Sequence, residues 1–112
     1  MKKVVFFTIL FTLLIPGCEK NNYDAPGCIE DKINEFIKTA ICDSGASVSL
    51  YTFNGKNVYL FSDGNCGADL GASVYSEDCN SLGFLGGISG NTLIQGVKFY
   101  DKADFVKWIW KN

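Results

Sequence analysis

The chain of 112 residues contains no arginine and no histidine. Without arginine it has no guanidinium group for bidentate binding of phosphate or carboxylate. Without histidine it has neither an imidazole base near neutral pH nor an imidazole metal ligand. Its ten lysines are outnumbered by twelve acidic residues and form no evident basic patch. Nucleic-acid binding and electrostatic docking on anionic lipid are therefore not expected, and many enzyme mechanisms are excluded.

A long apolar run occurs at the N-terminus, where Lys2 and Lys3 precede the apolar residues 4–15. A short positive region, an apolar segment and a small residue before a cleavage point are typical of a secretory signal peptide. The run is too short to cross a hydrocarbon core as a helix, which takes roughly 20 residues. Residues 1–17 are therefore expected to be removed from the mature protein.

Residues 15–18, Ile-Pro-Gly-Cys, resemble the lipobox of bacterial lipoproteins. In that family the peptide is cut before the cysteine, whose sulfur then carries a diacylglycerol. The resemblance implies lipidation of Cys18, and with it attachment to a membrane of the cell envelope, periplasmic or surface-exposed. Two or more acyl chains hold a protein stably, whereas one binds reversibly. The alternative is an uncleaved N-terminal anchor with Cys18 as a free thiol.

The remaining four cysteines are Cys28, Cys42, Cys66 and Cys79. An even number of cysteines in an oxidising compartment favours two disulfides. The rival interpretation is a four-thiolate zinc site, but no pair has the Cys-x2–4-Cys spacing of such sites. We therefore expect disulfides and neither a metal nor a cofactor.

Residues 18–27 are polar and are expected to be a flexible tether between the lipid and a single domain, residues 28–112. The domain begins with residues 28–42, where apolar side chains recur at helical spacing. Residues 47–53 and 56–62 are rich in Val, Tyr, Phe and Leu and flank Asn54-Gly55, which predicts a hairpin with a type I′ turn. Both faces of this hairpin are apolar, so each face needs a cover.

The second half of the domain has weaker signals. Residues 72–76 resemble a short third strand, residues 79–91 a loop, and residues 93–100 a fourth strand. Asp101 can cap a short final helix that would direct Phe105, Trp108 and Ile109 into the core, with a final strand as the alternative. The predicted fold is α+β: an N-terminal amphipathic helix packed on a small antiparallel sheet, and a short C-terminal helix.

The disulfide pairing follows from this layout. A helix of about 13 residues is about 20 Å long, and a disulfide needs Cα atoms within ~7 Å. Cys28 and Cys42 lie at opposite ends of the helix, so they cannot pair with each other. The strand directions bring Cys66 to the Cys42 end and Cys79 to the Cys28 end. We therefore predict the bonds Cys42–Cys66 and Cys28–Cys79.

Two loops could bind a ligand. Asp63, Asn65 and Asp69 place oxygen-bearing side chains at alternate positions, as in a calcium loop, although Val74 stands where such a loop has glutamate. The simpler interpretation is a polar turn. The glycine-rich loop could bind an anion or a partner through its backbone, but it lacks the ending of a P-loop, so a compact turn is the alternative. Its candidate residues are Gly86, Gly87, Ser89, Gly90 and Asn91.

Catalysis would have to rely on lysines or carboxylates. The pairs Asp63 with Asp69 and Glu77 with Asp78 could in principle serve glycoside hydrolysis. Trp108 and Trp110, flanked by Lys107 and Lys111, could form an aromatic binding strip. Because alternate residues on a helix point apart, the alternative is one ring in the core and one partly exposed.

The domain resembles a family of short bacterial lipoproteins of unknown function, seen mainly in Bacteroidetes-type bacteria. The resemblance rests on Cys28-Ile29, residues 51–59 around Asn54-Gly55-Lys56, Cys66, Val74-Tyr75, Cys79, residues 86–90 and Trp108-Ile109-Trp110. It implies a secreted, disulfide-stabilised domain and brings no catalytic residues. We expect a non-catalytic binding module with an unknown protein or glycan partner. The alternatives are an inhibitor of an envelope or extracellular hydrolase that presents residues 79–91, and a small carboxylate-dependent hydrolase.

Overall fold

The computed structural model describes residues 23–112 apart from residues 41 and 68. The predicted signal peptide and Cys18 lie outside the described residues. The described elements are α2 (Gly27–Thr39), β1 (Ser47–Phe53), β2 (Lys56–Ser62), β3 (Gly71–Ser76), β4 (Ser81–Gly86), β5 (Leu93–Ile94), β6 (Val97–Lys98), α3 (Phe99–Lys102) and β7 (Asp104–Lys111). No helix in this part of the chain is long and apolar enough to cross a membrane.

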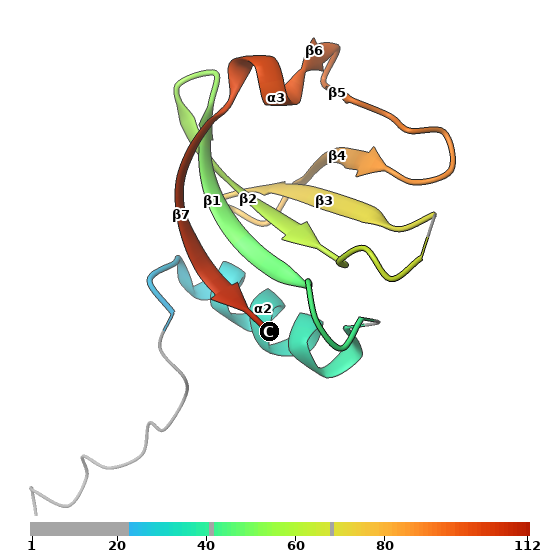
Figure 1. Cartoon of the computed structure of the whole chain (residues 1–112). Coiled ribbons are helices and arrows are strands. Elements are labelled where there is room, and N and C mark those ends of the chain that lie inside the picture. The colour runs from blue at the N-terminus through green and yellow to red at the C-terminus, as the bar shows by residue number, and fades with distance from the viewer. Residues whose placement is uncertain (1–22, 41, 68) are drawn as a thin grey trace, which may run out of the picture.

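Five antiparallel strands form the main sheet in the order β4-β3-β2-β1-β7, and β5 pairs with β6 (Figure 1). The β1–β2 hairpin has the predicted register, with Tyr51 opposite Val58 and Leu50 opposite Tyr59. Asn54 and Gly55 have φ of 55° and 77°, which are the positive values that a type I′ turn requires. The hairpin prediction is confirmed.

The predicted fold class is wrong, because the domain is mostly antiparallel sheet with one helix of 13 residues and one of four. Ser81–Gly86, which was expected to be loop, is strand β4. Residues 93–100, expected to be one strand, contain the short β5 and β6 and the start of α3. The sequence pattern did not predict β4, because Gly83 and Gly86 are unfavourable residues in strands and give no alternation of apolar and polar side chains.

The predicted C-terminal helix is also wrong. Only Phe99–Lys102 is helical, and Asp104–Lys111 is strand β7, which pairs with β1 and thereby makes the outer edge of the sheet. Two register shifts interrupt this pairing, between Val48 and Ser49 and between Leu50 and Tyr51. Backbone pairing with β1 outweighs the local capping pattern that favoured a helix.

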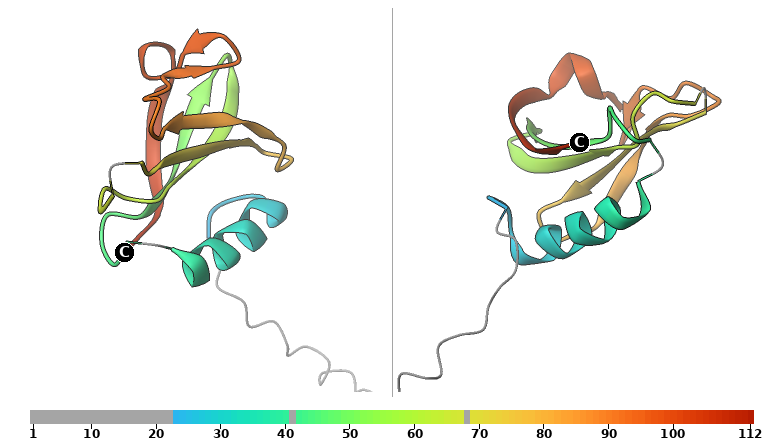
Figure 2. Two further views of the ribbon diagram at one scale, coloured as in Figure 1. Left: turned by 90° about the vertical axis from the view of Figure 1, so that its right-hand side faces the viewer. Right: turned by 60° about the horizontal axis from the view of Figure 1, so that its bottom comes forward.

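The two faces of the sheet are covered by different segments, α2 on one and β5 to α3 on the other (Figure 2), and each face has its own core. On one face α2 covers apolar side chains of β1 and β2 with its buried Ile29 and Ile33. Burying each such side chain stabilises the fold by about 1.5–3 kcal/mol. On the other face Ile94 and Phe99, both fully buried, cover Phe53, Val58 and Leu60. The segment from β5 to α3 is therefore the second cover that two apolar faces require.

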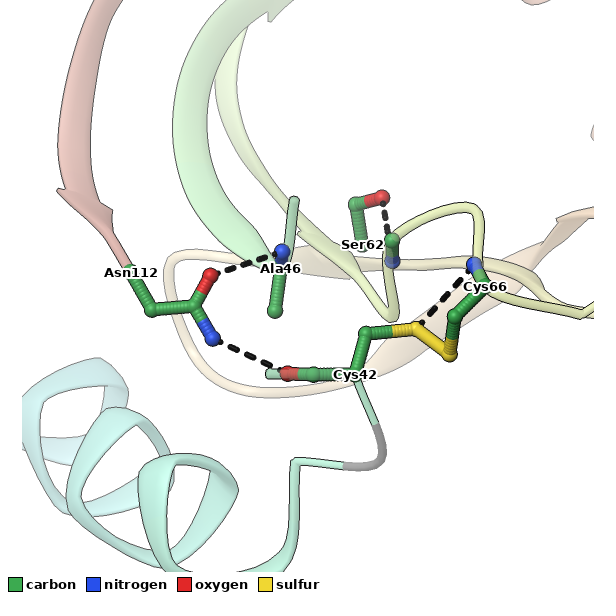
Figure 3. Close-up of a disulfide and its surroundings, with 6 residues drawn as sticks. Cys42, Ala46, Ser62, Cys66 and Asn112 are labelled. Carbon is green, nitrogen blue, oxygen red and sulfur yellow. Dashed lines mark hydrogen bonds between the residues drawn. A yellow bond between two sulfur atoms is a disulfide. The ribbon is translucent and has the colours of Figure 1, made fainter. Parts of the chain in front are cut away.

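Two disulfides join the same pairs that the layout predicted. Cys28–Cys79 connects the start of α2 to the β3–β4 turn, with 6.2 Å between the Cα atoms. Cys42–Cys66 connects the chain after α2 to the loop after β2, with 5.7 Å between the Cα atoms (Figure 3). Beside it, the Asn112 side chain accepts from the Ala46 N–H and donates to the Cys42 carbonyl, both at 3.0 Å.

The first described residues belong to the segment expected to be a tether, and they contact the domain. The Tyr23 N–H donates to a Glu30 carboxylate oxygen at 3.0 Å. Tyr23 and Ala25 pack against the core beneath α2. Asp24 forms an ion pair with Lys107 of β7. The chain therefore enters the domain beside its β7 edge.

Candidate functional site

A groove of about 680 Å³ lies between the β1–β2 turn and the β3–β4 turn. The lining side chains fall into three groups. Four are amides, three are charged and several are apolar. The amides are those of Asn54, Asn57, Asn80 and Gln95, the charged groups are Lys56, Glu77 and Asp78, and the apolar side chains are Phe53, Val58 and Leu82. Phe53 and Val58 are almost fully buried in the core below, so the half-buried Leu82 forms the accessible apolar base of the groove and the polar side chains form its rim.

The β3–β4 turn is a rigid wall of this groove. The Ser76 hydroxyl accepts from the N–H groups of Asp78 and Asn80, at 3.3 and 3.1 Å. The Ser76 carbonyl accepts from the Cys79 N–H at 2.9 Å, and the Ser76 N–H donates to the Asn80 carbonyl at 3.0 Å. Because Cys79 is also bonded to Cys28, the wall is fixed by both hydrogen bonds and a covalent link.

A polar contact joins this wall to the neighbouring strand. The Asn57 amide on β2 donates to a carboxylate oxygen of Glu77 at 3.1 Å. The bond orients Asn57 and leaves the remaining oxygens of both side chains able to accept hydrogen bonds. Burial, together with the negative charges of Glu77 and Asp24, raises the pKa of the neighbouring Tyr59 on β2. Glu77 therefore contributes to the electrostatics of the helix-side core as well as to the groove.

Unusual backbone conformations gather around the groove. In the described part of the chain, the non-glycine residues with positive φ are Asn54 at 55°, Cys79 at 67° and Gln95 at 53°. Asn54 and Gln95 line the groove, and Cys79 lies in its wall. Asn54 and Gln95 are the first residues of two-residue hairpin turns, which require positive φ. Turn geometry therefore accounts for two of these three conformations.

The predicted glycine-rich loop is a tight turn after β4. The Gly86 and Asn91 N–H groups donate to each other's carbonyls at 2.8 and 3.1 Å. The Gly90 N–H donates to Gly87 and the Gly87 N–H to Leu70, at 3.1 and 3.3 Å. These four donors are therefore engaged within the protein, while Ser89 lies at the tip beside Ile88, whose side chain is 88% exposed.

The candidate calcium residues lie in different surroundings. Asp63 lines a smaller cavity of about 260 Å³ between α2 and the sheet. The Asn65 side-chain oxygen lies next to Gly45 instead. Among the described residues, no group of three or more Cys, Asp or Glu could hold a metal ion. The second predicted carboxylate pair, Glu77 with Asp78, lies in the groove.

Reasoning from the sequence did not identify the groove. The sequence predicted Asn54 as a turn residue and Cys79 as a disulfide partner, and it assigned no binding role to the individual side chains of Asn57, Asn80 and Gln95. The four amides come from the β1–β2 turn, β2, the β3–β4 turn and the β5–β6 turn. Only the tertiary pairing of these elements brings them together, so no spacing along the chain signals the site.

Comparison with known proteins gives one match. A family model described as "Domain of unknown function (DUF6970)" matches residues 34–112. The match contains all the strands, both partners of Cys42–Cys66, and Cys79. No curated protein and no solved structure matches the chain.

Proposed function

The chain belongs to this family of domains of unknown function, and we propose that it is a lipid-anchored, non-catalytic binding module of the cell envelope. Its ligand is a glycan, held in the groove between the β1–β2 and β3–β4 turns. The observation that carries this proposal is the groove itself, a preformed site with a rigid wall, four amide side chains and an apolar base.

The chemistry of the lining side chains favours a sugar. A saccharide offers hydroxyl groups that both donate and accept hydrogen bonds, and each amide side chain can do the same. The C–H face of a sugar ring is apolar and suits the accessible side chain of Leu82 at the base of the groove. One lysine and two carboxylates leave the rim with little net charge, which matches a neutral ligand better than a phosphate.

The envelope location is supported by the sequence and by the disulfides. Residues 1–17 have the pattern of a signal peptide, and Cys18 follows a lipobox-like segment. Two disulfides in a domain of this size fit an oxidising compartment such as the periplasm or the cell surface. Mass spectrometry of Cys18 in membrane extracts tests the lipid directly.

The binding test uses the full chain and three soluble probes, chitotetraose, cellotetraose and maltotetraose. We expect one of them to shift the backbone and side-chain amide NMR signals of residues 54–57, 76–80 and 95. Asn57→Ala and Asn80→Ala each remove about one hydrogen bond to the sugar and weaken binding about fivefold, since one such bond contributes about 1 kcal/mol. Asn34→Ala on α2, on the far side of the sheet, is the matched control and leaves binding unchanged.

Three outcomes would replace this proposal. Amide shifts outside the groove, or equal affinities of Asn57→Ala and Asn34→Ala, would remove the groove as the site. Cleavage of a probe that is lost in Glu77→Gln would favour the carboxylate-dependent hydrolase. Inhibition in a panel of extracellular proteases, lost in Ile88→Asp, would favour the inhibitor, for which the exposed Ile88 on its hydrogen-bonded turn is the supporting observation.

A further inference from the structure

Three aromatic side chains that the groove does not use form an exposed surface at the β7 edge. Tyr100, Phe105 and Trp108 are 58%, 47% and 52% exposed. The ring centroids of Phe105 and Trp108 are 5.1 Å apart, and Tyr51 lies 5.5 Å from Phe105 and 6.4 Å from Tyr100. We call Tyr100, Phe105 and Trp108 the β7 aromatic surface. Rings exposed together to this extent mark an interaction site.

Lysines are frequent in the segment that carries the β7 aromatic surface. Residues 97–112 contain four lysines and two aspartates, whereas residues 23–96 contain three lysines and nine acidic residues. The Lys111 ammonium lies 4.7 Å from the Trp108 ring centroid, and Lys98 and Lys102 are exposed on β6 and α3. The chain has a net negative charge, whereas residues 97–112 have a local excess of positive charge, which is complementary to an anionic surface. Aromatic rings flanked by lysines are the side chains that proteins place at a membrane–water interface.

The chain enters the domain beside β7, on the face of the sheet that α2 covers. Asp24 is ion-paired with Lys107, which pairs with Leu50 of the core under α2. Phe105 and Trp108 lie on the other face of the same edge strand, opposite Tyr51 and Ser49. In Figure 1 the first described residues lie at the lower left, on the same side of the molecule as β7. Tyr23 follows Cys18 by five residues, so at ~3.6 Å per residue or less the two lie no more than about 18 Å apart. A lipid on Cys18 would therefore hold the β7 edge close to the bilayer.

Strand pairing with another chain is a poorer use of this edge. The two register shifts against β1 distort the ladder of β7, and Lys107 occupies its middle. Bulges and lysines are the features by which edge strands avoid pairing with a further strand. The exposed rings therefore need an occupant that does not depend on backbone hydrogen bonds, and a lipid surface meets that condition.

We propose that the β7 aromatic surface inserts at the headgroup level of the anionic membrane that holds Cys18. This inference rests on the anchoring part of the proposed function. It orients the domain, because β7 and β4 are the opposite edges of the sheet. When β7 lies against the lipid, β4 and the turn that carries Ile88 point away from the membrane.

The test uses the two tryptophans of the full chain as separate probes. Trp110→Phe leaves Trp108, and Trp108→Phe leaves Trp110, which packs against the core beneath α2. Each variant is mixed with vesicles of equal parts phosphatidylglycerol and brominated phosphatidylcholine. We expect Trp108 emission to shift to the blue and to lose at least half its intensity, with a much smaller change for Trp110. Lys102→Ala weakens vesicle binding about fivefold, whereas the control Lys38→Ala on α2 changes it less than twofold.

The outcomes separate this inference from the anchor. Quenching of Trp108 supports membrane insertion of the β7 aromatic surface, even if the protein is soluble in cells and Cys18 carries no lipid. If the protein is lipidated and membrane-bound but Trp108 is not quenched, insertion of the β7 aromatic surface is overturned, whereas the lipid anchor on Cys18 is not. A soluble, unlipidated protein without quenching overturns both. Quenching that is equal for Trp108 and Trp110, or equal with and without anionic lipid, also overturns the proposed surface.

Discussion

At the residue scale, one glycine determines how closely two strands approach. A Cβ atom at Gly71 would lie 2.1 Å from the Leu85 carbonyl oxygen and 2.8 Å from the Phe84 ring. The Leu85 oxygen cannot simply move away, because it belongs to the backbone and Leu85 is part of the core. The first residue of β3 must therefore lack a side chain for β4 to pair beside it.

Gly71→Ala is expected to destabilise the domain by about 2–3 kcal/mol, as overpacking of this kind does. Gly27→Ala is the matched control, since a Cβ there meets nothing within 4 Å and alanine favours the helix that begins at Gly27. Urea unfolding followed by circular dichroism measures both variants. Equal stability of the two would mean that the strands separate without cost.

At the element scale, β7 is fixed at its end by a side chain. Asn112 contacts Ala46 and Cys42 through its side-chain oxygen and nitrogen, and its own N–H donates to the Ala46 carbonyl at 3.2 Å (Figure 3). These bonds join the C-terminus to the segment between the Cys42–Cys66 disulfide and β1. They hold β7 in register beyond the shift between Val48 and Ser49.

Asn112→Ala is expected to speed hydrogen exchange of the β7 amides about thirtyfold, because losing two hydrogen bonds of about 1 kcal/mol each promotes local opening. Asn112→Asp retains the oxygen that accepts from Ala46 and should have a smaller effect. Exchange of the β2 and β3 amides serves as the internal control. A uniform increase across all strands would indicate global destabilisation instead of local opening of β7.

At the scale of the whole molecule, tyrosine ionisation makes the stability of the domain depend on pH in the alkaline range. Burial raises the pKa values of Tyr51 and Tyr59, and partial desolvation together with the neighbouring Tyr51 raises the pKa of the more exposed Tyr100. A raised pKa means that the folded state prefers the protonated phenol. The stabilisation is therefore complete below the ordinary tyrosine value of about 10 and is lost as the pH rises through the raised values.

We expect the free energy of unfolding to fall as the pH rises above about 10, and to lack any histidine contribution near neutral pH. Tyr59→Phe should reduce the alkaline loss, because the buried phenol that must ionise is removed. The measurement is urea unfolding at several pH values with phenolate absorbance recorded in parallel. The same alkaline slope in wild type and in Tyr59→Phe would contradict the contribution of Tyr59.

The features that depend on neighbouring residues along the chain could be predicted from the sequence. The period of Ile29 and Ile33 marks α2, and Asn54-Gly55 sets the turn and the register of the β1–β2 hairpin. These two elements, the predicted third antiparallel strand and the ~7 Å reach of a disulfide were together sufficient to pair all four cysteines correctly. Local geometry carries this information because each feature involves contacts a few residues apart or a single loop.

Only the tertiary structure decided the remaining features. Residues 104–111 have a local pattern that permits either helix or strand, and the free edge of β1 selects the strand by pairing with its backbone. The pairing of β3 with β4 likewise makes a strand from a glycine-containing segment. The groove amides and the β7 aromatic surface follow from these long-range pairings. Their positions therefore depend on contacts between distant parts of the chain, which no local pattern encodes.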